Sequence, residues 1–318
     1  MKNFWKKLEK PFFALAPMFD VTDPAFRAMF ARYSRPSKHA LVMWTEFVSA
    51  DGLDSPGQVA LIPMLDFTEE ERPIVAQIFS ARPDKIQQAA RLCAELRFDG
   101  IDINMGCPDK TILKQGSCGA LIKNPTLAIE IIQAAHDGAP DLPISVKTRT
   151  GFDYDDTESW CGKLLSADIQ AITLHARTVR DLSTPPARYD EITRLVELRD
   201  SLGLETIVIA NGDVQSLSDG EEVARRTGAD GIMVGRGAFG APWFFSGKDN
   251  LSPTEKLVIL QEHISLFNQV CQYKNFASMK KHFKSYVNGW DGARELRIAL
   301  MGTDTAEKAL DILRPIVD

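Results

Sequence analysis

Eight short apolar segments, separated by longer stretches with helical periodicity, occupy most of the first 245 residues of this chain. Nearly continuous runs of branched and aromatic residues are typical of parallel strands that are buried on both faces. Their alternation with helical patterns predicts βαβ units around a parallel sheet. We expect the strands at 13–18, 40–46, 73–79, 99–104, 143–149, 170–176, 205–211 and 230–235.

Helical patterns fill several of the intervals between these strands. Asp84, Asn124 and Ser216 lie near three of the helix starts and are candidate N-caps. Eight strand–helix repeats fit the size of a TIM barrel, or (β/α)8 barrel, of roughly 250 residues. The sequence therefore predicts an α/β barrel with helices at 24–33, 83–97, 125–137, 189–201 and 216–227.

Each apolar segment ends in residues that a buried strand has no packing reason to carry. In a TIM barrel the carboxyl ends of all strands meet at one face, where active sites are built. A single residue of this kind is equally well explained as a polar strand end whose hydrogen bonds are satisfied. Eight of them in register predict an active site. They are Pro17-Met18, Glu46, Gln77, Asn104, Lys147 with Arg149, His175, Asn211-Gly212 and Gly235-Arg236.

The strand pattern stops near residue 245. Ser252-Pro253 begins a helix with proline at its first position, and further helical segments follow at 276–288, 292–300 and 304–313. We therefore expect a barrel domain at 1–245 and a small all-helical domain at 246–318.

The formal net charge of −6 counts mildly against a nucleic-acid partner, because affinity for phosphates comes largely from Lys and Arg. Residues 272–300 nevertheless carry six basic residues against two acidic ones, so the tail is locally basic. The basic residues are Lys274, Lys280, Lys281, Lys284, Arg294 and Arg297.

Five cysteines at irregular spacings, without a CxxC pair, argue against a disulfide framework and against a structural zinc site. The first residues lack the apolar core of a signal peptide, and no apolar stretch is long enough to cross a bilayer. We expect a cytoplasmic monomer that binds no metal and no membrane.

Glycine-bearing loops follow the seventh and eighth strands, in IANGDV and MVGRGAFG. Loops at these positions commonly bind phosphate in TIM barrels, and Arg236 can add a charge-assisted hydrogen bond. The pattern predicts a phosphorylated ligand, either FMN or a sugar phosphate.

Lys147 and His175, with Gln77 from the third strand, would line one side of a planar ligand. Cations near the N1–O2 edge of a flavin stabilise its anionic reduced ring, which favours FMN. A Schiff-base lysine of an aldolase is the alternative for Lys147, and a structural histidine is the alternative for His175.

The segment DINMGCPDKTILKQGSCGALIKNP, residues 102–125, places Cys107 on the loop after the fourth strand. A loop thiol beside Lys110 and Lys114 is positioned to give or take a proton. A buried, inert cysteine is the competing interpretation, which we apply to the remaining cysteines in helical patterns, Cys93, Cys161 and Cys271.

Several motifs together resemble the tRNA-dihydrouridine synthases in order and spacing. They are APMFDVTDPAFR, VAQIF, DINMGCP, VKTRTG, LHART, IANGDV, GRGAFGAPWFF and the tail KKHFKSYVNGWDGARELR. The resemblance covers residues from about 14 to 313.

This resemblance implies an FMN enzyme that uses NADPH as its reductant. The backbone of Pro17, Met18 and Phe19 would lie near the isoalloxazine with Gln77. Lys147 and His175 would flank the ring and ribityl chain. The phosphate would be held by Asn211, Gly212, Asp213, Gly235 and Arg236.

The implied reaction reduces D-loop uridines of tRNA to 5,6-dihydrouridine, with a hydride from reduced FMN to C6 and a proton from Cys107 to C5. The uridine must leave the stack to reach the flavin. Asn104 and Arg177 would contact the uracil, and the tRNA would be gripped at its D-loop and elbow. The contributing basic residues would be Lys110, Lys280, Lys281, Lys284 and Arg294.

Three alternatives remain open at this point. An FMN barrel of the dihydroorotate or dihydropyrimidine dehydrogenase kind would act on a free pyrimidine. A cofactor-free barrel would work as an aldolase or isomerase through Lys147, and an RNA-binding module would have lost its chemistry.

Overall fold

A closed parallel barrel forms the larger part of the computed structural model, which describes residues 3–35, 37–248 and 251–317. The strands run in the spatial order β2-β1-β9-β8-β7-β6-β5-β4, and a β2–β4 pairing closes the ring, with the two-residue β3 added beside β4. All pairings are parallel. The strands are β1 Phe12–Leu15, β2 Leu41–Trp44, β3 Val48–Ser49, β4 Ile74–Phe79, β5 Gly100–Met105, β6 Ile144–Arg149, β7 Ala171–His175, β8 Ile207–Asn211 and β9 Gly231–Val234.

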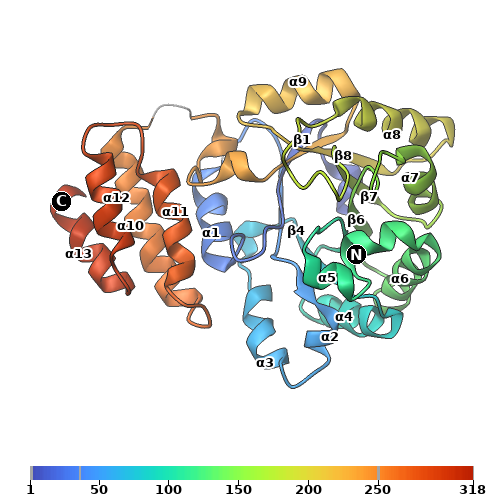
Figure 1. Ribbon diagram of the computed structural model, residues 1–318, viewed down its shortest axis with the longest axis horizontal. Helices are drawn as coiled ribbons and strands as arrows, with labels where there is room; N and C mark the ends of the chain where they lie inside the picture. The colour runs from blue at the N-terminus through green and yellow to red at the C-terminus, as the bar shows by residue number, and fades with distance from the viewer. Residues whose placement is uncertain (1–2, 36, 249–250, 318) are drawn as a thin grey trace.

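Helices surround this barrel, and four more form a separate group on one side of it (Figure 1). The barrel helices are α1 Pro24–Tyr33, α2 Ala50–Leu53, α3 Gln58–Leu61, α4 Pro83–Glu95, α5 Lys110–Lys114, α6 Pro125–Gly138, α7 Thr157–Leu165, α8 Tyr189–Ser201 and α9 Leu217–Thr227. The group at the side consists of α10 Pro253–Val270, α11 Ala277–Tyr286, α12 Ala293–Met301 and α13 Ala306–Val317. Short 3-10 helices are η1 Phe4–Lys7, η2 Ile62–Leu65, η3 Glu69–Glu71, η4 Cys118–Lys123, η5 Arg236–Ala238 and η6 Phe244–Ser246.

The predicted TIM barrel and its eight strands are confirmed. The expected ranges do not include β3 or the helices α2, α3, α5 and α7. Asn124 and Ser216 cap their helices, accepting from the N–H groups of Leu127 and Asp219. The cap expected at Asp84 is wrong: Pro83 takes the first helical position, so Arg82 is the N-cap and Asp84 lies inside the first turn.

Side chains alternate between the inside of the barrel and the layer under its helices. Along β1, Phe12 and Ala14 belong to an inner cluster with Trp44 and Met233, whereas Phe13 and Leu15 join the large outer core. Trp5 of η1 packs into the inner cluster beside Trp44. The same alternation turns the polar residues of β4 to β8 inward, where they line the half of the barrel interior nearer the carboxyl ends of the strands. These residues are Gln77, Asp102, Asn104, Ser145, Lys147, Thr173, His175 and Asn211.

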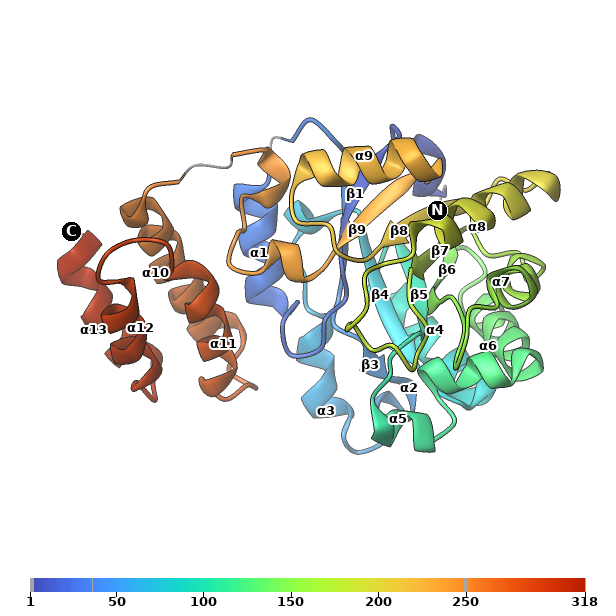
Figure 2. The same ribbon diagram turned by 45° about the horizontal axis from the view of Figure 1, so that its top comes forward.

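Helices α10 to α13 have a hydrophobic core of their own, with Leu260, Phe283, Leu300 and Leu313 fully buried. This core extends onto α1, which packs against α10. Figures 1 and 2 show α1 as the barrel helix that faces the tail group. Ser252 and Glu255 form a reciprocal capping box, so α10 begins where the sequence predicts. The division at residues 245 and 246 stays a prediction. None of the helices that the structure describes combines the length and apolarity needed to cross a bilayer.

Candidate active site

A cavity opens at the carboxyl ends of β1, β6, β7, β8 and β9. It is lined by most of the residues that the sequence predicts to bind a cofactor: Pro17, Met18, Lys147, His175, Asn211, Gly212, Asp213, Gly235 and Arg236. A larger hollow of about 650 Å³ lies at the amino-terminal ends of the strands, around Trp5, Gln170 and Asp230. Because active sites of TIM barrels lie at the carboxyl face, we assign function to the first cavity.

Four cationic groups surround His175 at the border of this cavity. The ring is largely buried, and this burial, together with the charges of Lys147, Arg149, Arg177 and Arg236, lowers the pKa of His175 far below its usual value. The histidine is therefore neutral at physiological pH. Its Nε2 lies 3.1 Å from a guanidinium nitrogen of Arg177 and serves as the acceptor there, since Arg can only donate.

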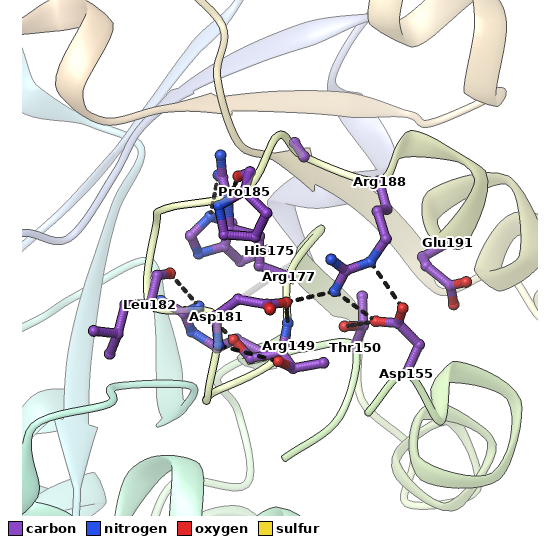
Figure 3. A network of polar contacts seen from close by, with 12 residues as sticks. Arg149, Thr150, Asp155, His175, Arg177, Asp181, Leu182, Pro185, Arg188 and Glu191 are labelled. Atoms are coloured by element: carbon purple, nitrogen blue, oxygen red, sulfur yellow. Dashed lines mark hydrogen bonds and ion pairs between the residues drawn. The ribbon is translucent and has the colours of Figure 1, made fainter. Parts of the chain in front are cut away.

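Arg177 is nearly fully buried, and each of its nitrogens has a partner. Its Nε donates to the carbonyl of Pro185 at 2.6 Å, and a terminal nitrogen donates to Asp213 Oδ2 at 2.6 Å. Arg236 reaches the other oxygen of Asp213 at 3.2 Å. Figure 3 shows Arg177 and His175 beside Pro185. One carboxylate thus ties two arginines from the β7 and β9 ends together.

Lys147 points into the barrel and donates to Asn211 Oδ1 at 3.1 Å. Asn211 is oriented by a second bond, from its Nδ2 to the carbonyl of Met233 at 2.8 Å, so its oxygen faces the lysine. Burial, reinforced by the charge of Arg149, lowers the pKa of Lys147 to about 8. An anion bound beside the ammonium group would reverse part of this shift.

Neighbouring segments approach the loop after β8 closely at two glycines: the loop after β9 at Gly237, and the segment between β7 and α8 at Gly212. A Cβ atom on Gly237 would lie 2.2 Å from the carbonyl oxygen of Val214, and one on Gly212 would lie 2.9 Å from the Cβ of Ala187. Gly212 also has φ +131, in the region that favours glycine. These glycines let both loops converge on the cavity.

The charges of the cavity fit an anionic, phosphorylated ligand such as FMN. Its lining contains Lys147 and Arg236, with Arg177 directly behind His175, and Asp213 is its carboxylate. That carboxylate is already paired with two arginines. Burial alone would raise the pKa of Asp213, but the hydrogen bond and charge of Arg177 outweigh it, so the pKa lies below its usual value. The lining therefore offers uncompensated positive charge next to exposed loop backbone.

Cys107 lies on the loop after β5 and is partly exposed. Its backbone N–H donates to Asn104 Oδ1 at 3.0 Å, and the N–H of Gly106 donates to the same oxygen at 3.1 Å. Burial and the charge of Asp109 raise the pKa of the Cys107 thiol above its ordinary value, although the backbone of Asp109 and nearby cations oppose this. The thiol is therefore protonated at neutral pH.

Arg149, at the end of β6, supports the same loop from its other side. Its Nε donates to the Gly106 carbonyl at 2.8 Å, and a terminal nitrogen donates to the carbonyls of Thr178 and Leu182. Figure 3 places Arg149 next to Asp181 and Leu182. The sequence identifies Arg149 only as a polar strand end. The structure shows that it links the loop after β5 to the loop after β7 by hydrogen bonds.

Other predicted site residues lie apart from the cavity. The ring of Phe19 is 60% exposed and packs on Phe47 at 5.3 Å, although the residues before it line the cavity. Gln77 is fully buried inside the barrel, on β4, and Lys110 is exposed at the start of α5.

The basic residues of the tail fall into two groups. Lys284 and Arg294 are exposed. Lys281 forms an ion pair with Asp20 of the barrel, and Lys280 donates to the carbonyl of Met301 at 3.0 Å. Lys274 is also paired, with buried acids of the barrel. The free positive charge of the tail is therefore smaller than the sequence suggests.

Cys93, Cys161 and Cys271 are buried, as predicted, and burial raises the pKa of each. Cys118 is buried as well, behind the Cys107 loop. Within the described ranges, no group of His, Cys, Asp and Glu side chains is arranged to hold a metal ion.

Comparison with known proteins gives a consistent result. The profile of the dihydrouridine synthase family (Dus) matches residues 14–317. A "Probable tRNA-dihydrouridine synthase" of Staphylococcus aureus (strain COL) is 37% identical over 317 residues, covering 98% of this chain and 95% of the relative. The "Probable tRNA-dihydrouridine synthase 2" of Bacillus subtilis (strain 168) is 37% identical over 322 residues, covering 100% and 96%.

Among solved structures, histamine dehydrogenase from Rhizobium sp. 4-9 aligns with a TM-score of 0.50 at 10% identity, covering 80% of this chain and 49% of that one. This likeness concerns the fold alone. The full-length match to the family profile and the two relatives confirm the resemblance found in the motifs: this chain belongs to the dihydrouridine synthase family.

Proposed function

We propose that this protein reduces uridines in the D-loop of tRNA to 5,6-dihydrouridine. The family and the names of the two relatives support the reaction. The observation that carries the proposal is the position of a protonated thiol, Cys107, on the loop after β5, at the same face of the barrel as the cationic cavity.

FMN is the cofactor that suits the cavity. Lys147 and His175 would flank the ring and the ribityl chain, while the loops of Asn211, Gly212, Asp213, Gly235 and Arg236 would hold the phosphate. Pro17 and Met18 border the same cavity. When bound and reduced by NADPH, FMN supplies the hydride for C6 of the uracil.

Cys107 completes the reduction by donating its Sγ proton to C5 of the uracil. A donor must keep its proton until the carbon becomes basic, and the raised pKa of this thiol meets that requirement. Asn104 and Arg177 would hold the uracil, which must leave the stacked loop to enter the site. Lys110 at the start of α5 would meet the RNA backbone beside it.

The helical tail would grip the tRNA near its elbow, since basic side chains contact phosphates without reading sequence. Lys284 and Arg294 are exposed and form no ion pair within the described residues, so they are available for this role, and Lys280 and Lys281 on α11 would add to it.

Purified protein with unmodified tRNA and NADPH tests the proposal. We expect a flavin absorption spectrum and dihydrouridine in the tRNA by mass spectrometry. Cys107→Ala should retain FMN but lose dihydrouridine formation, whereas Cys93→Ala, which removes a thiol from the interior of α4, should retain both. Full turnover by Cys107→Ala, or turnover of free dihydroorotate in place of tRNA, would contradict the proposal.

A further inference from the structure

We propose that Asp102, inside the barrel, is a positioning residue that sets the orientation of the Cys107 loop through the side chains of Gln77 and Asn104. The catalytic consequence rests on the function proposed above, but the structural claim can be tested without it. Asp102 is fully buried on β5 and lies outside the cavity lining.

A continuous chain of hydrogen bonds connects this carboxylate to the loop. Gln77 Nε2 donates to Asp102 Oδ2 at 2.6 Å, and Asn104 Nδ2 donates to Gln77 Oε1 at 3.0 Å. Asn104 Oδ1 then accepts the N–H groups of Gly106 and Cys107, at 3.1 and 3.0 Å. Asp102 and Asn104 face inward from the same strand, and Gln77 stands opposite Asp102 in the β4–β5 register.

The two ends of this chain fix its direction. Ionised Asp102 can only accept hydrogen bonds, so Gln77 must turn its amide nitrogen down to it and its oxygen up to Asn104. Asn104 must then offer its nitrogen to Gln77 and its oxygen to the loop. The backbone N–H groups at the far end can only donate and require that same orientation. Rotating either amide by 180° would bring donor against donor or acceptor against acceptor.

Burial makes this orientation costly to change. Gln77 and Asp102 have no exposed surface, so an unpaired group would find no bulk water to replace its partner. Ser145 donates to the other oxygen, Asp102 Oδ1, at 2.6 Å. A hydroxyl can also accept, so an asparagine at position 102 could bond to Ser145 with its nitrogen and still present an oxygen to Gln77.

The loop has a second, independent support. Arg149 holds the carbonyl of Gly106, and the N–H of Gly119 donates to the carbonyl of Cys107 at 3.3 Å. These bonds hold carbonyl oxygens, whereas the chain from Asp102 holds the N–H groups. Loss of the chain should therefore loosen the backbone at Cys107 without unfolding the loop.

Asp102→Ala, Asp102→Asn and the matched control Thr173→Val separate these roles. Thr173 is inward-facing and buried on β7, and its hydroxyl has no hydrogen-bond partner among the residues that the structure describes, so its replacement removes a buried polar atom without touching the chain. Amide hydrogen exchange of Gly106 and Cys107 is the direct measurement. We expect about tenfold faster exchange in Asp102→Ala, and rates within about twofold of wild type in Asp102→Asn and Thr173→Val.

The two half-reactions give a second readout that a general loss of stability would not produce. Asp102→Ala should reduce tRNA from the prereduced flavin at least about tenfold more slowly, with flavin reduction by NADPH changed by less than about twofold. Asn104→Leu removes the acceptor itself and should accelerate exchange at least as much as Asp102→Ala does; combining the two should add nothing to Asn104→Leu alone, since both cut the same chain.

Unchanged exchange at Gly106 and Cys107 in folded Asp102→Ala overturns the proposal, as does a fully additive double variant. Should Asp102→Ala not fold, Asp102→Asn with Ser145→Ala replaces it, because the amide at 102 then has nothing to fix its direction. Normal exchange in that variant overturns the proposal equally. A wild-type protein that leaves tRNA unmodified would refute the proposed function, while the exchange result would still decide the role of Asp102.

Discussion

Lys274 and Glu46, 228 positions apart in the chain, form a hydrogen-bonded ion pair between the helical tail and the barrel, with Nζ 3.0 Å from Oε1. Glu46, the second residue after β2, is fully buried, and the side chain of Lys274 is 8% exposed. Asp23, the N-cap of α1, lies 3.4 Å from the same ammonium group. One lysine thus compensates two buried carboxylates.

Lys274→Met should destabilise the fold by ~3–5 kcal/mol at pH 8, because it leaves buried carboxylates without their cation. Burial already raises the pKa of Glu46, and Lys274 opposes that rise. Without the lysine Glu46 will bind a proton more readily, so the loss should shrink as the pH falls towards 5. Urea unfolding at both pH values measures the effect.

Lys308→Met is the control for this variant, since Lys308 on α13 forms an exposed pair with Asp304, which precedes that helix. It should change the free energy of unfolding by less than about 0.5 kcal/mol. A similarly small effect of Lys274→Met at pH 8 would show that the buried pair does not stabilise the contact between tail and barrel.

The affinity of the apoprotein for FMN should fall as the pH rises through about 8, because burial lowers the pKa of Lys147 to that value and the cation is lost above it. Binding near pH 8 should be accompanied by proton uptake. Titration calorimetry in buffers of different ionisation enthalpy measures both. Lys147→Met should bind FMN more weakly at pH 7 and lose this pH dependence, whereas Lys163→Met, at an exposed position of α7, should retain it.

Transfer from prereduced flavin to tRNA should be constant near neutral pH and fall to half only at a pH above 9. Burial raises the pKa of the Cys107 thiol above its ordinary value of 9.0, so the proton-donating form stays in the majority up to that pH. Alkylation by iodoacetamide, which needs the thiolate, should follow the opposite course. Rapid alkylation of Cys107 at pH 7 would contradict a protonated donor.

Lys284→Ala with Arg294→Ala should weaken tRNA binding and lower the slope of log affinity against log salt by about 2, if each side chain contacts one phosphate. FMN binding should not change, because both residues lie on the tail. Binding measured at several salt concentrations checks this. Lys308→Ala with Arg314→Ala removes the same charge from α13 and should leave the slope intact.

The cavity could be predicted from the sequence because its residues end strands. Lys147, His175 and Asn211 each close an apolar run, and the closure of a barrel brings such ends together whatever the details of packing. The eight strands follow from the same runs. The cap at Asp84 is wrong although the sequence holds the signal that corrects it: Pro83 favours the first helical position, as Pro253 does in α10.

Contacts between distant segments were beyond the sequence. Lys274 counts as a surface charge in any local reading, and its burial depends on how the tail packs against Glu46. Similarly, Asp102 reads as one polar position in a strand, and its bond to Gln77 depends on the register of β4 against β5. Arg149 gains its role from loops that follow two other strands, β5 and β7.

Helix α1 belongs to both hydrophobic cores: Phe26 and Phe30 pack under the barrel, while Ala25 and Met29 pack into the tail. The helix follows directly on the segment that carries Pro17 and Met18 to the cavity. A helix shared by both cores couples the tail to the segment that borders the cavity. An RNA bound by the tail would therefore reach the cavity at a fixed number of nucleotides from its contact with the tail. The distance between tail and cavity would then select which nucleotide is modified.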